Sequence, residues 1–233
     1  MQNTSQLYQD ILSDRNHWFE YRLDVNGAGT FGEDVVRSIQ TKSEMFQDDP
    51  EIGKAVSAEV DVEMLTPSVE LPQMAEMRPF VRVCAEGRQS EWIPQGVFYI
   101  DTRPRSKNPS AFSVLTIHGF DAMMKAEQPF QSNTITGDST DTDMVDEIAS
   151  ILGVEVDSRT YDIMANGYTV PLLTGYSCRE VLGFIGSMYV GSFVMTEEGK
   201  LRLVSILELP PETNYLITEE AENITFGGDR ILV

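Results

Sequence analysis

Few side chains in this sequence could supply nucleophilic or acid–base chemistry. It contains two histidines, His17 and His118, and two cysteines, Cys84 and Cys178. A histidine can act as a general base near neutral pH, and a cysteine thiolate beside it is a nucleophile. Only the residue types support a Cys178–His118 dyad, since neither histidine lies in a known catalytic motif. The position of His118 at the expected end of a strand, before Gly119, favours a half-buried structural role.

Two acidic clusters have the residue types of a metal site. Glu59, Asp61 and Glu63 alternate along one face of a predicted strand, and stacked carboxylates can bind a cation. Solvent exposure explains the same pattern. Residues 138–143 contain three aspartates but lack the central glycine and closing glutamate of a calcium loop. Capping of the following helix by Asp or Thr, with negative charge at the helix N-terminus, explains them without an ion.

Carboxylates are so numerous that a pair of them carries little information. The chain has 37 Asp and Glu residues against 17 Lys and Arg, and its formal net charge is −20. A glycosidase needs two carboxylates at a set separation, and this sequence offers too many pairs to single one out. We therefore predict no catalytic, cofactor-binding or metal-binding residues, and we expect the protein not to be an enzyme.

Neither the cysteines nor the glycines form a ligand motif. Cys84 and Cys178 lie far apart and outside any C-x-x-C pattern, so we predict neither a disulfide framework nor a zinc knuckle. The glycine-rich residues 28–32 lack the lysine and hydroxyl of a phosphate-binding loop, and we expect a connecting loop there. Two free thiols are typical of a cytosolic product.

The negative charge argues against nucleic acid or anionic membrane as a partner, because affinity for phosphate comes from Lys and Arg. The simplest interpretation is a solvated surface that keeps the protein soluble. The sequence starts without a basic region followed by an apolar one, which predicts no secretion signal. No apolar run is long enough to span a bilayer. We expect synthesis in the cytoplasm.

The element around which the chain is organised is a predicted β-hairpin. Residues 96–104 and 111–125 are rich in β-branched and aromatic side chains, and the polar link 105–110 contains proline. Apolar side chains occur on both alternating faces of the second run, so both faces are expected to be partly covered. This pattern is typical of a barrel or a packed interface.

Further strands are predicted in the first 120 residues, with a single short helix at residues 1–12. Residues 35–46 are ambiguous between strand and helix. Residues 54–65 alternate cleanly, which indicates a half-buried antiparallel strand. After a connection at 67–79, residues 80–84 are expected to pair with 95–101. The predicted strands lie at residues 17–25, 54–65, 80–84, 95–101 and 111–120. So many strands with so little helix indicate a small barrel or sandwich.

After residue 120 helices enter the pattern. Residues 121–128 predict one or two helical turns, and residues 144–152 and 178–189 predict helices. Ser177, with Glu180 three residues later, has the spacing of a capping box. Residues 154–176 are rich in loops, and a hairpin is expected at 192–206.

These elements predict an α+β fold that is mainly β. An N-terminal antiparallel β-barrel-like domain is expected at residues 13–120. A small α/β domain with two helices and a β-hairpin is expected at residues 121–209. Residues 210–233 would start a further β segment or form a closing strand.

Several segments resemble tail hub proteins of long-tailed bacteriophages and prophages. Residues 96–101, with the sequence GVFYID, and residues 115–124, a strand ending in an aromatic-Asp-Ala-Met step into a helix, are similar to the first domain of that family. Residues 49–60 are similar to the family as well. The helix and hairpin of residues 177–203 are similar to the family's second domain through residues 179–182 and 199–203. The segments follow the family's order.

The resemblance implies a structural virion component, a phage or prophage tail or baseplate hub that closes the tail tube and links it to the tail tip. It implies a homotrimer assembled from the bacterial cytoplasm into the tail, where it contacts the tail tube, distal tail, tape measure and tip proteins. DNA would pass through its lumen without specific binding, and acidic walls would keep it from sticking. In the family a second barrel domain follows at the position of residues 231–233, so the chain would be either a short hub or a fragment.

Two other functional classes stay open on the sequence. One is a soluble enzyme, such as a hydrolase with an unrecognised site. The other is a carbohydrate-binding β-module, in which an exposed Trp18 or Trp92 would stack on sugar rings, although core packing is the commoner role of tryptophan.

Overall fold

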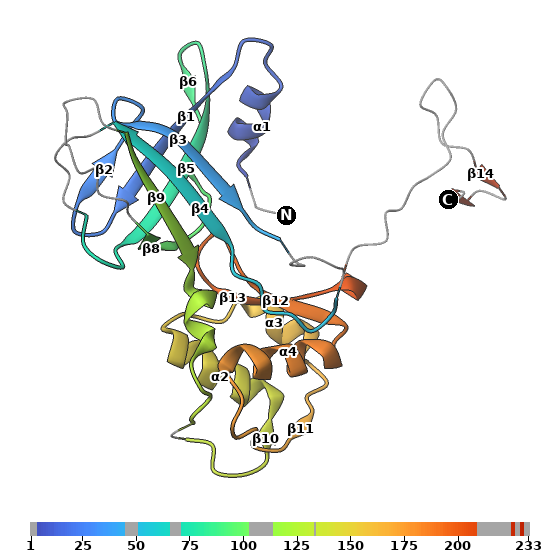
Figure 1. The fold of residues 1–233 in the computed structure, drawn as a ribbon. Coiled ribbons are helices and arrows are strands. Elements are labelled where there is room, and N and C mark those ends of the chain that lie inside the picture. The colour runs from blue at the N-terminus through green and yellow to red at the C-terminus, as the bar shows by residue number, and fades with distance from the viewer. Residues whose placement is uncertain are drawn as a thin grey trace.

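The structure is a computed structural model that describes residues 4–44, 51–65, 71–102, 114–132, 134–208, 225–226 and 229–230. The described part forms two layers, an antiparallel sheet and, below it, a smaller body of helices with a β-hairpin (Figure 1). Each layer has its own cluster of buried apolar side chains. The prediction of an α+β fold that is mainly β is confirmed.

The upper layer is one sheet in the order β2-β1-β5-β8-β9-β4-β3, with β6 and β7 paired to β5. Every pairing in it is antiparallel. The strands are β1 (Trp18–Val25), β2 (Gly29–Phe31), β3 (Val36–Lys42), β4 (Glu59–Leu65), β5 (Glu76–Ala85), β6 (Arg88–Gln89), β7 (Ile93–Pro94), β8 (Phe98–Thr102) and β9 (Val114–Asp121).

The alternation predicted for β4 is present, and it directs one face of the strand into the upper core. Val60, Val62 and Met64 are completely buried, while the acidic residues between them are partly or fully exposed. Alternate side chains of a strand point to opposite faces, so this pattern places the core on one side of the sheet. The strand is shorter than predicted, because residues 54–58 leave the sheet and run to the lower layer.

The central hairpin is confirmed as the pair β8 and β9, with register from Phe98↔Asp121 to Thr102↔His118. The link 105–110 lies outside the described residues. The two faces of β9 are less equal than expected, since Ile117 is completely buried and Val114 is 40 % exposed. Because one face of the sheet meets the core and the other meets solvent, the prediction of two covered faces is wrong for this end of the strand.

Pairing around β5 differs from the prediction. The strand begins at Glu76, inside the predicted connection, and it meets β8 only through Glu76↔Tyr99 and Met77↔Phe98. Its middle pairs with β7 instead, through Phe80↔Pro94. Residues 28–32, predicted as a connecting loop, contain the short strand β2, and residues 36–42 of the ambiguous segment form β3.

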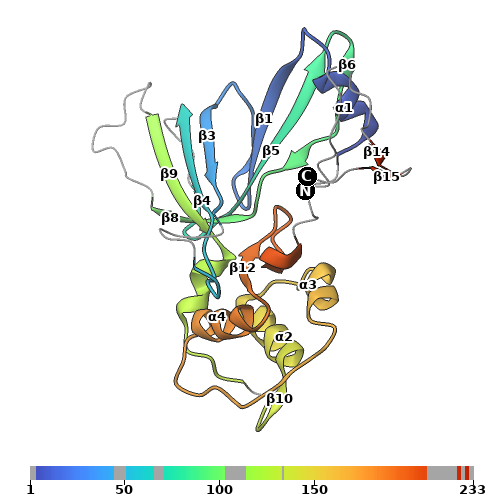
Figure 2. The ribbon, with the colours of Figure 1, turned by 90° about the vertical axis from the view of Figure 1, so that its right-hand side faces the viewer.

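The sheet curls but does not close into a barrel, which corrects the prediction of a barrel-like domain. Its last strand, β3, lies beside β1 without a backbone ladder between them (Figure 2). Instead, the Tyr21 hydroxyl of β1 donates to the carbonyl oxygens of Val36, at 3.1 Å, and Arg37, at 3.3 Å. A side chain therefore bridges the seam that a closed barrel would fill with backbone hydrogen bonds.

The predicted N-terminal helix is α1 (Gln6–Leu12). It packs Ile11 against Val83 and Ala85 of β5. Its N-cap residue Ser5 donates from its backbone N–H to the carboxylate of Glu91, at 2.8 Å. The helix is thus fixed to the upper sheet at its N-terminus and along one face.

In its described part the lower layer holds the two predicted helices, the predicted hairpin and one α-helix that was not predicted. Both predicted helices begin with a capping box, Thr140 with Asp143 and Ser177 with Glu180. The elements are η1 (Ala122–Glu127), β10 (Ser139–Thr140), α2 (Asp141–Leu152), α3 (Ser158–Ile163), β11 (Thr169–Val170), α4 (Cys178–Met188), β12 (Gly191–Met195), β13 (Leu201–Ser205) and η2 (Ile206–Glu208).

The segment at the C-terminus is described only in part. The strands β14 (Thr225–Phe226) and β15 (Asp229–Arg230) pair with each other. The rest of residues 210–233 lies outside the described residues. The division into segments 13–120, 121–209 and 210–233 stays a prediction. Over the described ranges, no helix has both the length and the hydropathy that crossing a membrane requires.

Candidate functional site

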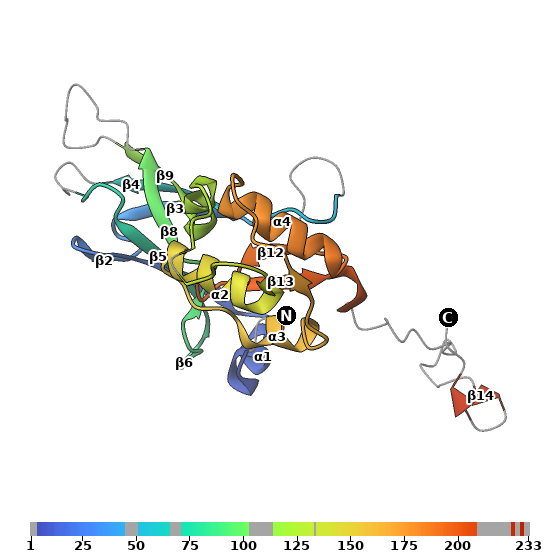
Figure 3. The same cartoon turned by 90° about the horizontal axis from the view of Figure 1, so that it is seen from below.

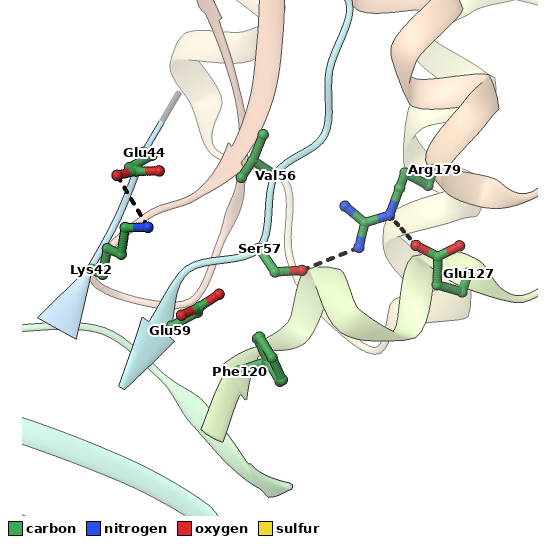
Figure 4. A pocket seen from close by; sticks show the side chains of 8 residues that line it. All are labelled: Lys42, Glu44, Val56, Ser57, Glu59, Phe120, Glu127 and Arg179. Carbon is green, nitrogen blue, oxygen red and sulfur yellow. Dashed lines mark hydrogen bonds and ion pairs between the residues drawn. The ribbon is translucent and has the colours of Figure 1, made fainter. Parts of the chain in front are cut away.

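The candidate site is the joint between the two layers, and Arg179 lies at its centre. The guanidinium extends from the start of α4 and donates to the carbonyl oxygens of Ala55 and, at 2.9 Å, Met123. It also donates to Ser57 Oγ, at 3.1 Å, and forms an ion pair with Glu127, at 2.5 Å (Figure 4). The planar fork of an arginine can serve several acceptors at once. One side chain therefore ties α4 and η1 to residues 55–57, which lead into β4.

A pocket of about 430 Å³ opens beside Arg179. Its other cation, Lys42, forms an ion pair with Glu44 at 3.3 Å. Among the described residues that line the pocket, both cations are therefore paired with carboxylates. The side chains that line it are Lys42, Glu44, Val56, Ser57, Glu59, Phe120, Glu127 and Arg179 (Figure 4).

Asp121, where β9 passes into η1, is a buried carboxylate in the same joint. It is 2 % exposed and accepts hydrogen bonds from the backbone N–H groups of Ala58, at 2.8 Å, and Met123, at 2.9 Å. Burial raises the pKa of Asp121 to about 6, against the opposing effect of the two N–H groups and the charge of Arg179. Because it fixes a strand end to a helix start, this residue orients the lower layer on the sheet.

Residues 51–57 connect β3 and β4 of the upper sheet through the lower layer. Ala55 forms a parallel β-bridge with Phe193 of β12. The Phe193 N–H donates to the carbonyl oxygen of Lys54, at 2.9 Å, and the Lys54 N–H donates to Ser192 Oγ, at 3.3 Å. The segment therefore adds a short extended stretch beside β12 of the lower hairpin.

Lys125 provides a further tie across the joint. Its ammonium group lies 3.9 Å from the centre of the Tyr99 ring on β8, a cation–π contact. The same group donates to the carbonyl oxygen of Leu152 at the end of α2, at 3.5 Å. This cation also complements the negative end of the α2 dipole. The joint is thus held by several independent contacts.

The structure places the two residues of the conceivable dyad in different surroundings. His118 lies on β9, with Nδ1 2.9 Å from Asp61 of β4 and its ring against Phe120. Cys178 is completely buried in the lower core, where burial raises the pKa of its thiol. A raised pKa lowers the thiolate fraction, which disfavours nucleophilic attack. Burial likewise raises the pKa of Cys84.

The acidic clusters that resembled metal sites have other partners. Asp61 contacts His118, and Glu63 lies 3.9 Å from Arg37. Asp143 accepts from Thr140 in the capping box, as the capping interpretation predicted. Within the residues described by the structure, no group of three or more His, Cys, Asp or Glu side chains is arranged to hold a metal ion.

The two tryptophans that could bind sugar lie on the upper sheet. Trp18 is 49 % exposed. Trp92 is half-buried, and the guanidinium groups of Arg22 and Arg82 lie 4.8 and 4.4 Å from its ring centre. Neither tryptophan therefore has the core position that the sequence favoured, since Trp18 is exposed and Trp92 packs half-buried against two arginines.

Sequence reasoning did not single out Arg179 or Asp121 as site residues. Both lie in segments that carried the family resemblance, Asp121 in the aromatic-Asp-Ala-Met step and Arg179 at the start of a helix. Their position could have identified them, because both lie at predicted boundaries between two elements, where a charged side chain can join one element to the other.

The architecture defines an α+β protein in which a curled antiparallel sheet is joined by hydrogen bonds and an ion pair to a small helical layer. The crystal structure of the prophage MuSo2 43 kDa tail protein from Shewanella oneidensis is similar, with a TM-score of 0.54 and 16 % sequence identity over 91 % of this chain and 62 % of that chain. A tail protein from Neisseria meningitidis MC58 is also similar, with a TM-score of 0.51 and 11 % identity over 83 % of this chain and 53 % of that chain.

At these identities the similarity shows a shared fold. The chain spans less than two thirds of the length of either tail protein. The sequence matches no protein-family model and none of the curated proteins with which it was compared.

Proposed function

We propose that this chain is a structural component of a phage or prophage tail. The observation that carries the proposal is the similarity of 91 % of the chain to a prophage tail protein, with a second tail protein sharing the fold. The sequence resemblance to tail hub proteins rests on the residues themselves and points the same way.

Within the tail, we propose that the chain is the hub that closes the tail tube and links it to the tip. In this role residues 13–120 form the hub domain, residues 121–209 form the second domain, and residues 210–233 begin a further β segment. The hub would be a homotrimer in contact with the tail tube, distal tail, tape measure and tip proteins. The net charge of −20 suits a lumen through which DNA slides without binding.

The joint around Arg179 supports a structural role in the hub. A hub must hold neighbouring parts of the tail at a fixed angle, and several hydrogen-bonded and ionic contacts across a joint restrict motion between its two layers. The described ion pairs at the joint, Arg179 with Glu127 and Lys42 with Glu44, use these charges in contacts within the protein.

Immunogold electron microscopy on particles released after prophage induction tests the proposal. An antibody against this chain should label the distal end of tails, and particles from a strain that lacks the gene should stay unlabelled. Unlabelled tails, with the protein free in the cytosol, would overturn the tail assignment and favour a soluble enzyme or binding module. Label along the tail tube would retain a tail role and reject the hub.

A further inference from the structure

A second pocket, of about 480 Å³, lies where the upper sheet meets the start of α3 and the hairpin of β12 and β13. Seen from below, this hairpin lies between α4 and α3, so the pocket is on the α3 side of the lower layer (Figure 3). Its size is typical of a site for a small molecule. We call it the Trp92 pocket, and its lining residues are 91–94, 157–159, 196–198, Lys200 and Arg202.

The two walls of the Trp92 pocket are fixed to each other at Gly199, in the turn of the lower hairpin. A Cβ on Gly199 would lie 2.8 Å from Cγ2 of Val97, which precedes β8, so the turn packs its backbone directly on the upper layer. Gly199 also has φ of +81°, a conformation that glycine adopts readily. This close contact sets the distance between the turn and the sheet, and therefore the width of the pocket.

The aromatic ring in the pocket is held in place from the sheet. The guanidinium groups of Arg22 and Arg82 lie 4.8 and 4.4 Å from the centre of the Trp92 ring, and Arg82 forms an ion pair with Glu20 at 2.5 Å. Trp92 is half-buried, and part of its surface lines the pocket. A fixed aromatic ring offers a large contact area to a ligand at a low cost in conformational entropy.

Polar side chains of the pocket are held in place as well. Glu91 accepts hydrogen bonds from the backbone N–H of Ser5, at 2.8 Å, and from its hydroxyl, at 2.5 Å. The guanidinium of Arg159 donates to both carboxylate oxygens of Asp157, at 2.8 and 2.6 Å. Groups that are already in position lose little freedom when a ligand binds. The pocket is therefore preorganised on both of its walls.

The balance of charge in the pocket indicates an uncharged ligand. Among the described residues that line it there are four carboxylates and three cations, in a chain with a net charge of −20. Arg159 is paired with Asp157 at 2.6 Å, and Lys200 is paired with Glu155 at 3.1 Å. An anion would be repelled by the carboxylates and a cation by the guanidinium and ammonium groups. A neutral ligand avoids both costs.

Hydroxyl groups suit such mixed surroundings, because each can donate one hydrogen bond and accept two. One hydroxyl can donate to a carboxylate and accept from a guanidinium beside it, and hydrogen bonds to charged groups are roughly twice as strong as neutral ones. A pyranose ring carries hydroxyls around its edge and C–H groups on its faces, and such a face can pack on an aromatic ring. We propose that the Trp92 pocket binds a neutral pyranose oligosaccharide, with a sugar ring on Trp92 and its hydroxyls bonded to Asp157 and Arg159.

The binding site goes beyond the tail assignment and does not rest on it. A tail component would bring the pocket to the glycans of a cell surface, and a soluble binding module would meet the same class of ligand. The labelling experiment and the sugar titration therefore fail separately.

Tryptophan fluorescence tests the site directly. Trp18→Phe leaves Trp92 as the only tryptophan, since the chain contains two. Titration of this variant with cellotriose, maltotriose, mannotriose and chitotriose should give a saturable blue shift with at least one of the four. Sorbitol, which has hydroxyls but no ring, should give none. No shift with any of the trisaccharides, or an equal shift with sorbitol, would overturn the inference.

A variant that fills the pocket tests its location. Ser158 is exposed and lines the pocket, so Ser158→Phe, made in the Trp18→Phe chain, should weaken binding by about 10-fold or more. Ser150→Phe is the matched control, because Ser150 is exposed on α2 and does not line the pocket. Both variants should unfold at nearly the same temperature. Undiminished binding by Ser158→Phe, or equal losses in the two variants, would overturn the site.

Tri-lysine tests the alternative of a basic peptide, which the exposed Glu197 and Glu198 would attract. We expect no shift of the Trp92 emission with this probe. A saturable shift with tri-lysine, and none with the trisaccharides, would replace the sugar by a cationic ligand and so reject the inference.

Discussion

Gly53 and Gly183 meet so closely that neither has room for a side chain. A Cβ on Gly53 would lie 2.7 Å from the carbonyl oxygen of Gly183, and a Cβ on Gly183 would lie 2.6 Å from the carbonyl oxygen of Gly53. Two backbones, one from the segment between β3 and β4 and one from α4, are therefore in direct contact. This contact sets how far residues 51–57 enter the lower layer.

Gly53→Ala should destabilise the protein by about 3 kcal/mol, from overpacking and from strain at positive φ. Gly87→Ala is the matched control, because Gly87 has φ of +71° against +78° for Gly53 but has nothing within 4 Å of an added Cβ. The control should lose about 1 kcal/mol, the cost of the backbone conformation alone. Urea unfolding followed by circular dichroism measures both, and equal losses would contradict the close contact.

Arg179→Lys should lower the free energy of unfolding by about 2 kcal/mol, although the charge is kept. An ammonium group on a flexible stem cannot reach the carbonyl oxygens of both Ala55 and Met123, so an acceptor is left without its donor. Arg88→Lys, at an exposed ion pair with Asp14, should change the stability by about 0.5 kcal/mol or less. Similar losses in the two variants would show that the joint does not depend on the guanidinium.

Asp121 should make stability fall as the pH rises from about 4 to about 7. The pKa of Asp121 is raised to about 6 in the folded chain, above its usual value of 3.8, so the folded state binds this proton more tightly. Its contribution is fully present below the unfolded pKa and is lost as the pH passes the folded pKa. Two pKa units correspond to about 3 kcal/mol.

Comparison of the wild type with Asp121→Asn isolates that contribution, because the other titrating groups cancel. The variant cannot ionise and leaves one of the two backbone N–H groups without an acceptor, so we expect it to be the less stable chain at pH 4 by about 2 kcal/mol or more. The difference in the free energy of unfolding should shrink as the pH rises from about 4 to about 6 and should level off above that. A difference that is constant from pH 4 to pH 7 would refute the raised pKa.

Tyr21→Phe should loosen the seam between β1 and β3 and lower stability by about 1 kcal/mol, since it removes the hydroxyl that bridges the two strands. Hydrogen exchange should speed up for the amides of β3. Tyr161→Phe, which removes the hydroxyl that donates to Asp146 on the surface of the lower layer, is the control and should leave exchange in β3 unchanged. Unaltered exchange in both variants would mean that the seam is held by other contacts.

Cys84 and Cys178 should not react with 5,5′-dithiobis(2-nitrobenzoic acid) in the native protein, because both thiols are buried and burial raises their pKa. Both should react once the chain is unfolded in guanidinium chloride. Ser150→Cys, at an exposed position of α2, supplies a thiol that should react at once. Rapid native labelling of Cys178 would reopen the possibility of a reactive site.

Local patterns in the sequence predicted those elements that are determined by interactions between neighbouring residues. The capping box of Ser177 and Glu180 marked the start of α4, and the alternation around Val60 and Val62 identified β4, because these signals depend on neighbouring residues. The short helix α3 was missed. It is held by a distant contact, in which Thr160 Oγ1 accepts the N–H of Leu203 at 3.1 Å, and six residues are too few to show helical periodicity.

The contacts of the joint could not be predicted from local patterns either, because they connect residues that lie far apart in the sequence. Arg179 binds Ala55, which lies 124 positions earlier in the chain, and no spacing rule connects the two. Whether the barrel closes depends on the position of β3 relative to β1. Hydrophobic patterns and strand propensities do not specify that position. The resemblance to tail hub proteins indicated the order of the parts but not the contacts between them.

The position of residues 51–57 in the lower layer has a consequence for synthesis. Lys54 binds Ser192, which lies 138 positions later in the chain, so at synthesis rates of about 5–20 residues per second the early segment waits roughly 10 s for its partner. The upper strands can pair in that interval, while residues 53–55 still lack their partners in β12. A fragment made only of residues 121–208 would lack residues 51–57, which belong to the lower layer in the structure.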